Sequence, residues 1–140
     1  MEKEVIVKVI GSGELSDGDQ VVTEARGRYY EKDGKTYIFY DLPDENDHSV
    51  VVKHKVLLAG NSMKITKTSG DTKSEIHYLP GRKTSSAYAT PYGVLDLTFH
   101  TKRFDTTKSD GCLIVELVYD ILMGEEVLSA NNLKMIVTEC

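Results

Sequence analysis

Two basic side chains, His54 and Lys67, fall on a face that the sequence pattern otherwise makes apolar. The dipeptide Gly60-Asn61 predicts a two-residue hairpin turn, which makes the residues on either side cross-strand partners. In that register His54 faces Lys67 among valine, leucine, isoleucine and methionine side chains. A buried cation is costly, so it is usually paired, shifted in pKa or functional. The pair is therefore our first candidate for binding a small anionic or amphipathic ligand.

A structural role for the same two residues competes with ligand binding. If they lie at the open end of the sheet, the long Lys67 stem can reach water past Ser69 and Ser74. In that case the ammonium is solvated and the apolar part of the side chain packs. The sequence leaves both interpretations open.

Four tyrosines share the predicted inward face by strand parity: Tyr29, Tyr40, Tyr78 and Tyr119. Each offers an apolar ring and a hydroxyl that needs a partner when it is buried. Such rings line ligand pockets, and they equally fill cores. A barrel of about eight strands has an interior wide enough only for side chains or one small ligand. We expect a filled core in preference to a hollow one, with these tyrosines as candidate ligand contacts.

The sequence contains no recognisable catalytic or metal-binding motif. Its histidines form no His-x-His and no His-Glu-x-x-His, and Gly-x-Ser-x-Gly, Walker and dinucleotide patterns are missing. Cys112 and Cys140 form no Cys-x-x-Cys motif. We therefore predict a non-enzymatic protein without catalytic residues, metal or cofactor, and rank an enzyme below the binding functions.

Length and composition predict one globular domain spanning residues 1–140. The chain is 40% hydrophobic and 28% charged, which excludes the disordered and membrane classes. No apolar run approaches the roughly 20 residues of a spanning helix, and none resembles a secretory leader. We expect a cytoplasmic protein with reduced thiols and no membrane partner.

Charge is distributed unevenly along this acidic chain, whose formal net charge is −5. Residues 50–90 contain seven Lys and Arg against two acidic residues. On the predicted outward parity, a basic face then forms from Lys53, Lys55, Lys64, Lys73 and His77. Such a face can hold an acidic protein or RNA. This interaction module is the alternative to the ligand-binding barrel.

The elements that would position these residues are short strands separated by dense turn signals. The turns include Asp17-Gly18, Asp33-Gly34, Gly60-Asn61, Gly70-Asp71, the corner Thr90-Pro91-Tyr92-Gly93, Asp110-Gly111 and Asn131-Asn132. Strands are predicted near 4–15, 21–31, 36–42, 50–59, 62–69, 72–79, 84–90, 93–103, 112–123 and 133–139. With about ten strands and no helix to cover a flat sheet, the chain is predicted to form an all-β, antiparallel, closed or nearly closed barrel.

The turn Asp33-Gly34 also predicts which residues oppose one another in its hairpin. Tyr40 then covers the bare backbone of Gly27 on the inward face. Continuing the same register places Ala25 opposite Leu42, and Arg26 opposite Asp41.

These motifs resemble the bacterial YwiB-like family of uncharacterised β-barrel proteins. The residues concerned are Gly27-Arg28-Tyr29-Tyr30, Tyr37-Ile38-Phe39-Tyr40-Asp41, Tyr88-Ala89-Thr90-Pro91-Tyr92-Gly93 and Tyr119-Asp120-Ile121-Leu122-Met123-Gly124. The resemblance implies a calycin-like or lipocalin-like barrel in a bacterial cytoplasmic protein, and it supplies no catalytic residues. Asp41 stands where the family favours glutamate, and Lys67 where arginine is common. Lysine lacks the planar fork that binds a carboxylate bidentately.

Overall fold

Ten strands form the part of the chain that the computed structural model describes, residues 2–13, 21–43, 49–70, 72–90 and 93–139. They are β1 (Lys3–Gly13), β2 (Val21–Lys32), β3 (Lys35–Pro43), β4 (Val51–Ala59), β5 (Ser62–Ser69), β6 (Thr72–Tyr78), β7 (Lys83–Thr90), β8 (Gly93–Ser109), β9 (Cys112–Met123) and β10 (Glu126–Glu139). The described residues include no helix long and apolar enough to cross a membrane. The predicted turn at Asp17-Gly18, and residues Asp71, Pro91 and Tyr92 of two others, lie outside the described residues.

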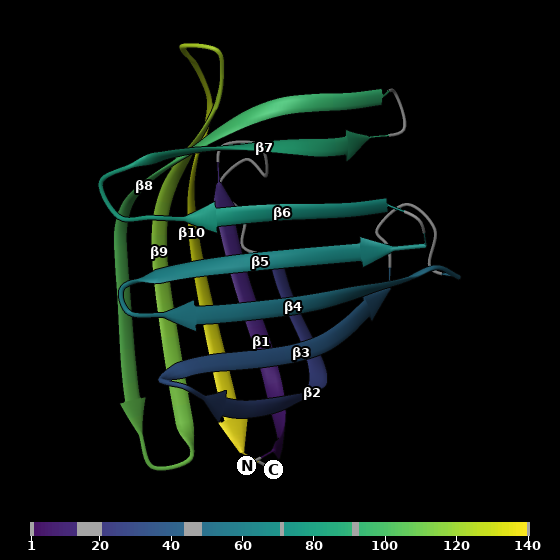
Figure 1. Cartoon of the computed structure of the whole chain (residues 1–140), viewed down its shortest axis with the longest axis vertical. Helices are drawn as coiled ribbons and strands as arrows, with labels where there is room; N and C mark the ends of the chain where they lie inside the picture. Colours follow the sequence, from purple (N-terminus) through teal and green to yellow (C-terminus); the bar gives the residue numbers. More distant parts are fainter. Residues whose placement is uncertain (1, 14–20, 44–48, 71, 91–92, 140) are drawn as a thin grey trace.

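The strands form one antiparallel sheet in the order β6-β5-β4-β3-β2-β1-β10-β9-β8-β7. Strands that are neighbours in sequence pair with each other, except β6 and β7, and β1 also pairs with β10, so the two ends of the chain meet inside the sheet. In Figure 1, β3 to β6 run across the view, whereas β1, β9 and β10 run down it behind them. The sheet therefore curls over itself, which confirms the predicted all-β, nearly closed barrel.

The seam of the barrel lies between β6 and β7, the two ends of the strand order. Side-chain hydroxyls of β7 bridge this seam to backbone carbonyls of β6. Thr84 Oγ1 donates to the His77 carbonyl, and Ser86 Oγ donates to the Glu75 carbonyl at 2.5 Å. These bonds occupy acceptors that an exposed edge strand would otherwise offer to another chain.

Local turn chemistry explains the register of the β2–β3 hairpin. Asp33 and Gly34 both have positive φ, 54° and 76°, as a two-residue turn that matches strand twist requires. The predicted pairing of Gly27 with Tyr40 is confirmed. The ladder stops there, so the expected pairs of Ala25 with Leu42 and Arg26 with Asp41 are not part of it. Beyond Tyr40, β3 pairs on its other side with β4, while β2 continues along β1.

The later strands are longer than the sequence pattern predicted. β10 begins at Glu126 rather than near 133, and β8 continues to Ser109 rather than ending near 103. Asn131-Asn132 predicted a turn, but both residues pair with β9, beyond an irregularity between Val127 and Ser129. Long-range pairing with β9 thus overrides the polar local sequence in both strands.

Side chains fill the described interior of the barrel. Ile38, Met63, Leu117 and Met135 are among the fully buried residues of one continuous core. Around the same core, Tyr78, Phe99 and Tyr119 pack ring against ring with centroids 5.0 to 6.1 Å apart. A continuous core of this kind agrees with the filled interior that we expected.

Candidate functional site

His54 and Lys67 are direct cross-strand partners on β4 and β5, as the Gly60-Asn61 register predicted. They lie toward the end of the barrel where β3 and β5 finish and β4 and β6 begin, which we call the mouth. The His54 ring stacks on Tyr40, with centroids 4.7 Å apart and planes 10° apart. The structure therefore brings three of the predicted site residues together.

Burial, and secondly the nearby positive charge of Lys67, lower the pKa of His54 to about 4. The imidazole is therefore neutral at physiological pH, and its Nδ1 lies 3.2 Å from the Val52 carbonyl oxygen. Burial also raises the pKa of Tyr40, which stays protonated. Within this trio the positive charge therefore lies on Lys67.

Acidification is expected to destabilise the protein through His54. The folded state holds the pKa of this imidazole near 4, below the ordinary 6.5. The stabilising contribution is therefore complete above pH 6.5 and is lost as the pH falls toward 4. Because the ring keeps some solvent contact, we expect a loss of about 1 kcal/mol. Urea unfolding at pH 7 and pH 4.5 should show a larger drop for the wild type than for His54→Phe, which keeps the stacked ring. Equal drops would refute the assignment to His54.

The other predicted site tyrosines do not join this trio. Tyr78 and Tyr119 pack with Phe99 in the core cluster described above. Tyr29 lies toward the opposite end of the barrel, where its hydroxyl donates to Glu31 Oε1 at 2.6 Å. The six residues predicted to share a ligand pocket are therefore divided among three places.

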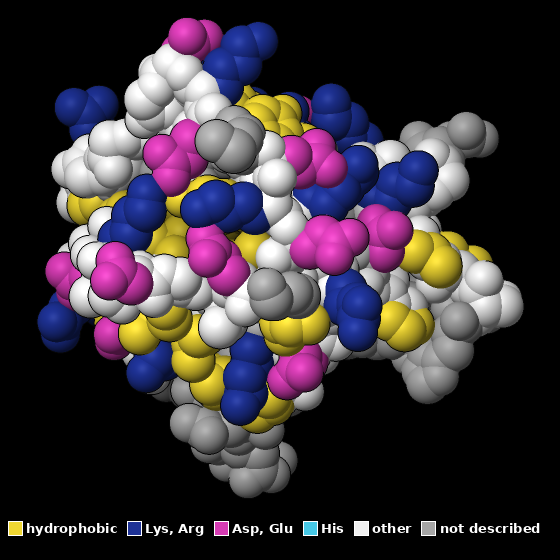
Figure 2. Space-filling model, turned by 90° about the horizontal axis from the view of Figure 1, so that it is seen from below, with side chains coloured by type: hydrophobic (Ala, Val, Ile, Leu, Met, Phe, Trp, Pro, Cys, Tyr) yellow, Lys and Arg dark blue, Asp and Glu magenta, His cyan; other side chains and the backbone are white. Residues whose placement is uncertain are grey.

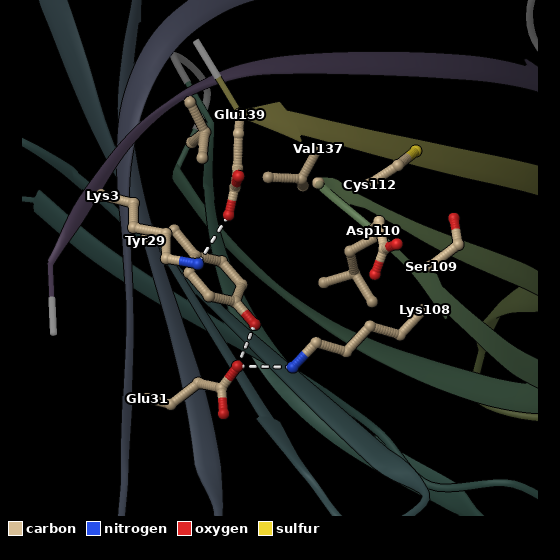
Figure 3. A pocket seen from close by; sticks show the side chains of 12 residues that line it. Lys3, Tyr29, Glu31, Lys108, Ser109, Asp110, Cys112, Val137 and Glu139 are labelled. Carbon is tan, nitrogen blue, oxygen red and sulfur yellow. Dashed lines mark hydrogen bonds and ion pairs between the residues drawn. The ribbon is translucent and has the colours of Figure 1, made fainter.

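Tyr29 lines a hollow of about 220 Å³ beside the chain termini and the β8–β9 turn (Figure 3). Lys108 Nζ donates to Glu31 Oε1 at 2.5 Å, and Lys3 Nζ donates to Glu139 Oε1 at 2.6 Å. Figure 2 shows this end of the molecule from below, with acidic and basic side chains interspersed around apolar ones. Each lysine of the hollow pairs with a glutamate, and Asp110 adds a further acidic group to the lining, so the hollow does not favour an anionic ligand.

A column of aromatic rings on the outer surface of β2 and β3 was not recognised as a site from the sequence. The Tyr30 and Tyr37 rings stack with centroids 4.9 Å apart and planes 12° apart. Phe39 extends the stack from Tyr30, at 5.7 Å and 16°. All three side chains are half-buried, so their edges reach solvent. Strand parity could have placed these rings on one face, but it could not have predicted that they stack.

Cations cover both members of β3 in this column. Lys55 Nζ lies 5.7 Å from the Tyr37 centroid, and the Arg28 guanidinium lies 6.0 Å from the Phe39 centroid. Both distances are within the range of cation–π attraction. Among the described residues Arg28 forms one ion pair, with Glu2 at a long 3.8 Å, and its cross-strand partner on β1 is Glu4. Both cations can therefore turn toward a bound anion.

The predicted basic face is only partly available for binding. Lys64 and Lys73 both pair with Glu75, at 3.6 and 3.3 Å, which offsets much of their charge. Lys53 and Lys55 of β4 form no ion pair within the described part of the chain. The positive surplus therefore lies over β2 to β4, next to the rings, rather than over β4 to β6 as expected.

A groove of about 240 Å³ adjoins the ring column where the β2–β3 ladder stops. The backbone of Gly27 lines the groove, together with Arg26, Arg28, Phe39 and Asp41. We call the surface formed by the column, its cations and this groove the aromatic–cationic face; its residues are Arg26, Arg28, Tyr30, Tyr37, Phe39, Asp41, Lys53 and Lys55.

No cluster of three or more His, Cys, Asp or Glu side chains suited to a metal ion occurs among the described residues. Among the described residues, the aromatic–cationic face and the mouth each place a cation beside an aromatic ring.

Known proteins similar to this chain share its barrel. A family model described as a domain of unknown function, DUF1934, matches residues 6–135. The uncharacterized beta-barrel protein YwiB of Bacillus subtilis (strain 168) is 25% identical over 119 residues, which cover 84% of this chain and 81% of the relative. The crystal structure of ywiB protein from Bacillus subtilis matches with a TM-score of 0.80 at 23% identity, covering 99% of this chain and 93% of that one. These matches confirm the resemblance seen in the sequence, and the structural one bears on the fold alone.

Proposed function

The chain belongs to the DUF1934 family, whose function is unknown, and from its surface geometry we propose that it is a binding module for an anionic macromolecule, an acidic protein or RNA. The observation behind the proposal is the stacked column of Tyr30, Tyr37 and Phe39 with a cation over each outer ring. The aromatic–cationic face is the proposed binding surface.

The electrostatics of this face favour an anion, although the chain as a whole has a negative net charge. Arg26, Lys53 and Lys55 form no ion pair in the described part of the chain, and Arg28 forms only a long one, with Glu2 at 3.8 Å. Two acidic groups lie beside these cations: Asp41, the cross-strand partner of Lys53, and Glu4, which lines the groove. A local positive surplus of this size is enough to attract a polyanion at short range, although the net charge of −5 opposes long-range steering.

Titration with a short linear inorganic polyphosphate tests the proposal, because this probe offers charge without bases or side chains. If about four cations contact the probe, the logarithm of the binding constant should fall with the logarithm of salt concentration with a slope of about −3. The intrinsic tyrosine fluorescence reports binding, since Tyr30 and Tyr37 lie in the site. Absence of binding at low salt, or binding that salt leaves unchanged, would contradict the proposal.

A small anionic or amphipathic ligand at the mouth is the second candidate, favoured by the cluster of His54, Lys67 and Tyr40. The exposed large hydrophobic residues of the described chain all lie at strand ends opposite the chain termini: Val22, Val51, Val94, Leu95, Met123, Val127 and Leu128. An amphipathic ligand would place its head group near Lys67 and its tail on such residues. Because the described interior is filled, the ligand would sit at the mouth and not inside, unlike the cavity that a lipocalin-like barrel implies.

A further inference from the structure

We propose that the partner of the aromatic–cationic face is a single-stranded nucleic acid, an inference that rests on the function proposed above. The face combines flat rings, cations and a groove of nucleotide size on three neighbouring strands. Single-stranded nucleic acids are bound by this combination, in which bases stack on aromatic rings and cations track the phosphates. Each part of the face corresponds to one part of a nucleotide.

The ring column supplies the stacking surface. Its planes differ by only 12° and 16°, so a base can extend the stack from either end. Lys55 now covers Tyr37 at one end, and Arg28 covers Phe39 at the other. A base that stacks on Tyr37 displaces the flexible Lys55 ammonium, which then lies beside the phosphate of the same nucleotide. At the other end the planar guanidinium of Arg28 can itself stack on a base.

The groove beside Gly27 supplies a place for one nucleotide. Its volume of about 240 Å³ accommodates a base, with Arg26 and Arg28 on one wall. The wall formed by β3 contains Phe39, whose ring supports the Arg28 guanidinium, and the Asp41 carboxylate, which can accept a hydrogen bond from an amino group on a base edge.

The same features disfavour an acidic protein as the partner. Asp41 and Glu4 both line the groove, and they would repel the carboxylates of an acidic peptide. Carboxylates also gain nothing from the faces of the rings, which carry partial negative charge. A nucleic acid strand avoids this conflict, because it places neutral bases in the groove and its phosphates over the surrounding cations.

The test compares three labelled probes by fluorescence anisotropy. They are a single-stranded DNA of about eight nucleotides, an abasic strand with the same number of phosphates, and a polyglutamate of equal charge. We expect the DNA to bind at least about tenfold more tightly than the abasic strand, because stacking stabilises each bound base. Phe39→Leu should remove most of this tenfold difference while leaving abasic binding unchanged.

A second variant covers the case in which Phe39→Leu fails to fold. Arg26→Ala changes an exposed side chain of the groove, and should weaken DNA binding more than abasic binding. Equal affinities for DNA and the abasic strand would overturn the inference and leave the anion-binding function intact. Preference for polyglutamate would overturn it in favour of an acidic protein. If no probe binds, both the inference and the proposed function are wrong.

Discussion

Replacing Gly27 with alanine is expected to destabilise the barrel by about 3 kcal/mol, the largest stability effect that we predict for a single methyl group. The added Cβ would overlap the backbone carbonyl oxygen of Phe39 and come within 3.2 Å of both Tyr40 Cβ and Val7 Cγ2. A flexible side chain could move aside, but this carbonyl belongs to the hairpin in which Gly27 pairs with Tyr40. Relief therefore requires the strands to separate.

Urea unfolding of three proteins measures this effect. Gly11→Ala is the matched control, because a Cβ at this β1 glycine would meet nothing within 4 Å. We expect Gly11→Ala to unfold like the wild type, within about 0.5 kcal/mol, and Gly27→Ala to unfold at much lower urea. If both variants are equally stable, Gly27 does not approach the Phe39 backbone as described, and the floor of the groove is wrong.

The double variant Lys53→Glu with Lys55→Glu is expected to weaken polyphosphate binding about a hundredfold at low salt. It reverses the charge of the two outward lysines of β4. Two attractive contacts become repulsive, and the salt slope should also become shallower by about 2. Isothermal titration at two salt concentrations measures both quantities. Both side chains are exposed, so we expect little change in stability.

Two control variants identify the cause of any such loss. Arg82→Glu with Lys83→Glu changes the net charge equally at exposed positions outside the aromatic–cationic face. It should reduce affinity only slightly, through screened long-range charge. Lys67→Met removes the cation at the mouth and should leave polyphosphate binding unchanged. If Lys67→Met abolishes binding while the β4 reversal has no effect, the mouth is the site and the outer face is not.

Much of the hairpin structure could be predicted because turn chemistry fixes register locally. Asp33-Gly34 placed Gly27 opposite Tyr40, and Gly60-Asn61 placed His54 opposite Lys67, both as observed. Alternation along each strand then assigned residues to the inner or outer face. The predicted register became less accurate with distance from each turn, as at the end of the β2–β3 ladder. There, pairing with other neighbouring strands determines where each strand runs.

The candidate site was less predictable because it depends on side-chain geometry across strands. Parity placed Tyr29 and Tyr40 on one face, but Tyr29 lies nearer the chain termini and hydrogen bonds to Glu31. The count of charges along the sequence assigned Lys64 and Lys73 to the binding face, whereas both form ion pairs with Glu75. Stacking and ion pairing follow from rotamers that a linear pattern does not contain.

The signals of the aromatic rings in a nuclear magnetic resonance titration with polyphosphate test the central claim most directly. If the aromatic–cationic face binds the anion, the ring signals of Tyr37 and Phe39 should shift as Lys55 and Arg28 turn toward the phosphates, while the His54 ring signal stays in place. A shift of the His54 ring with unchanged Tyr37 and Phe39 signals would contradict the account and place the bound anion at the mouth.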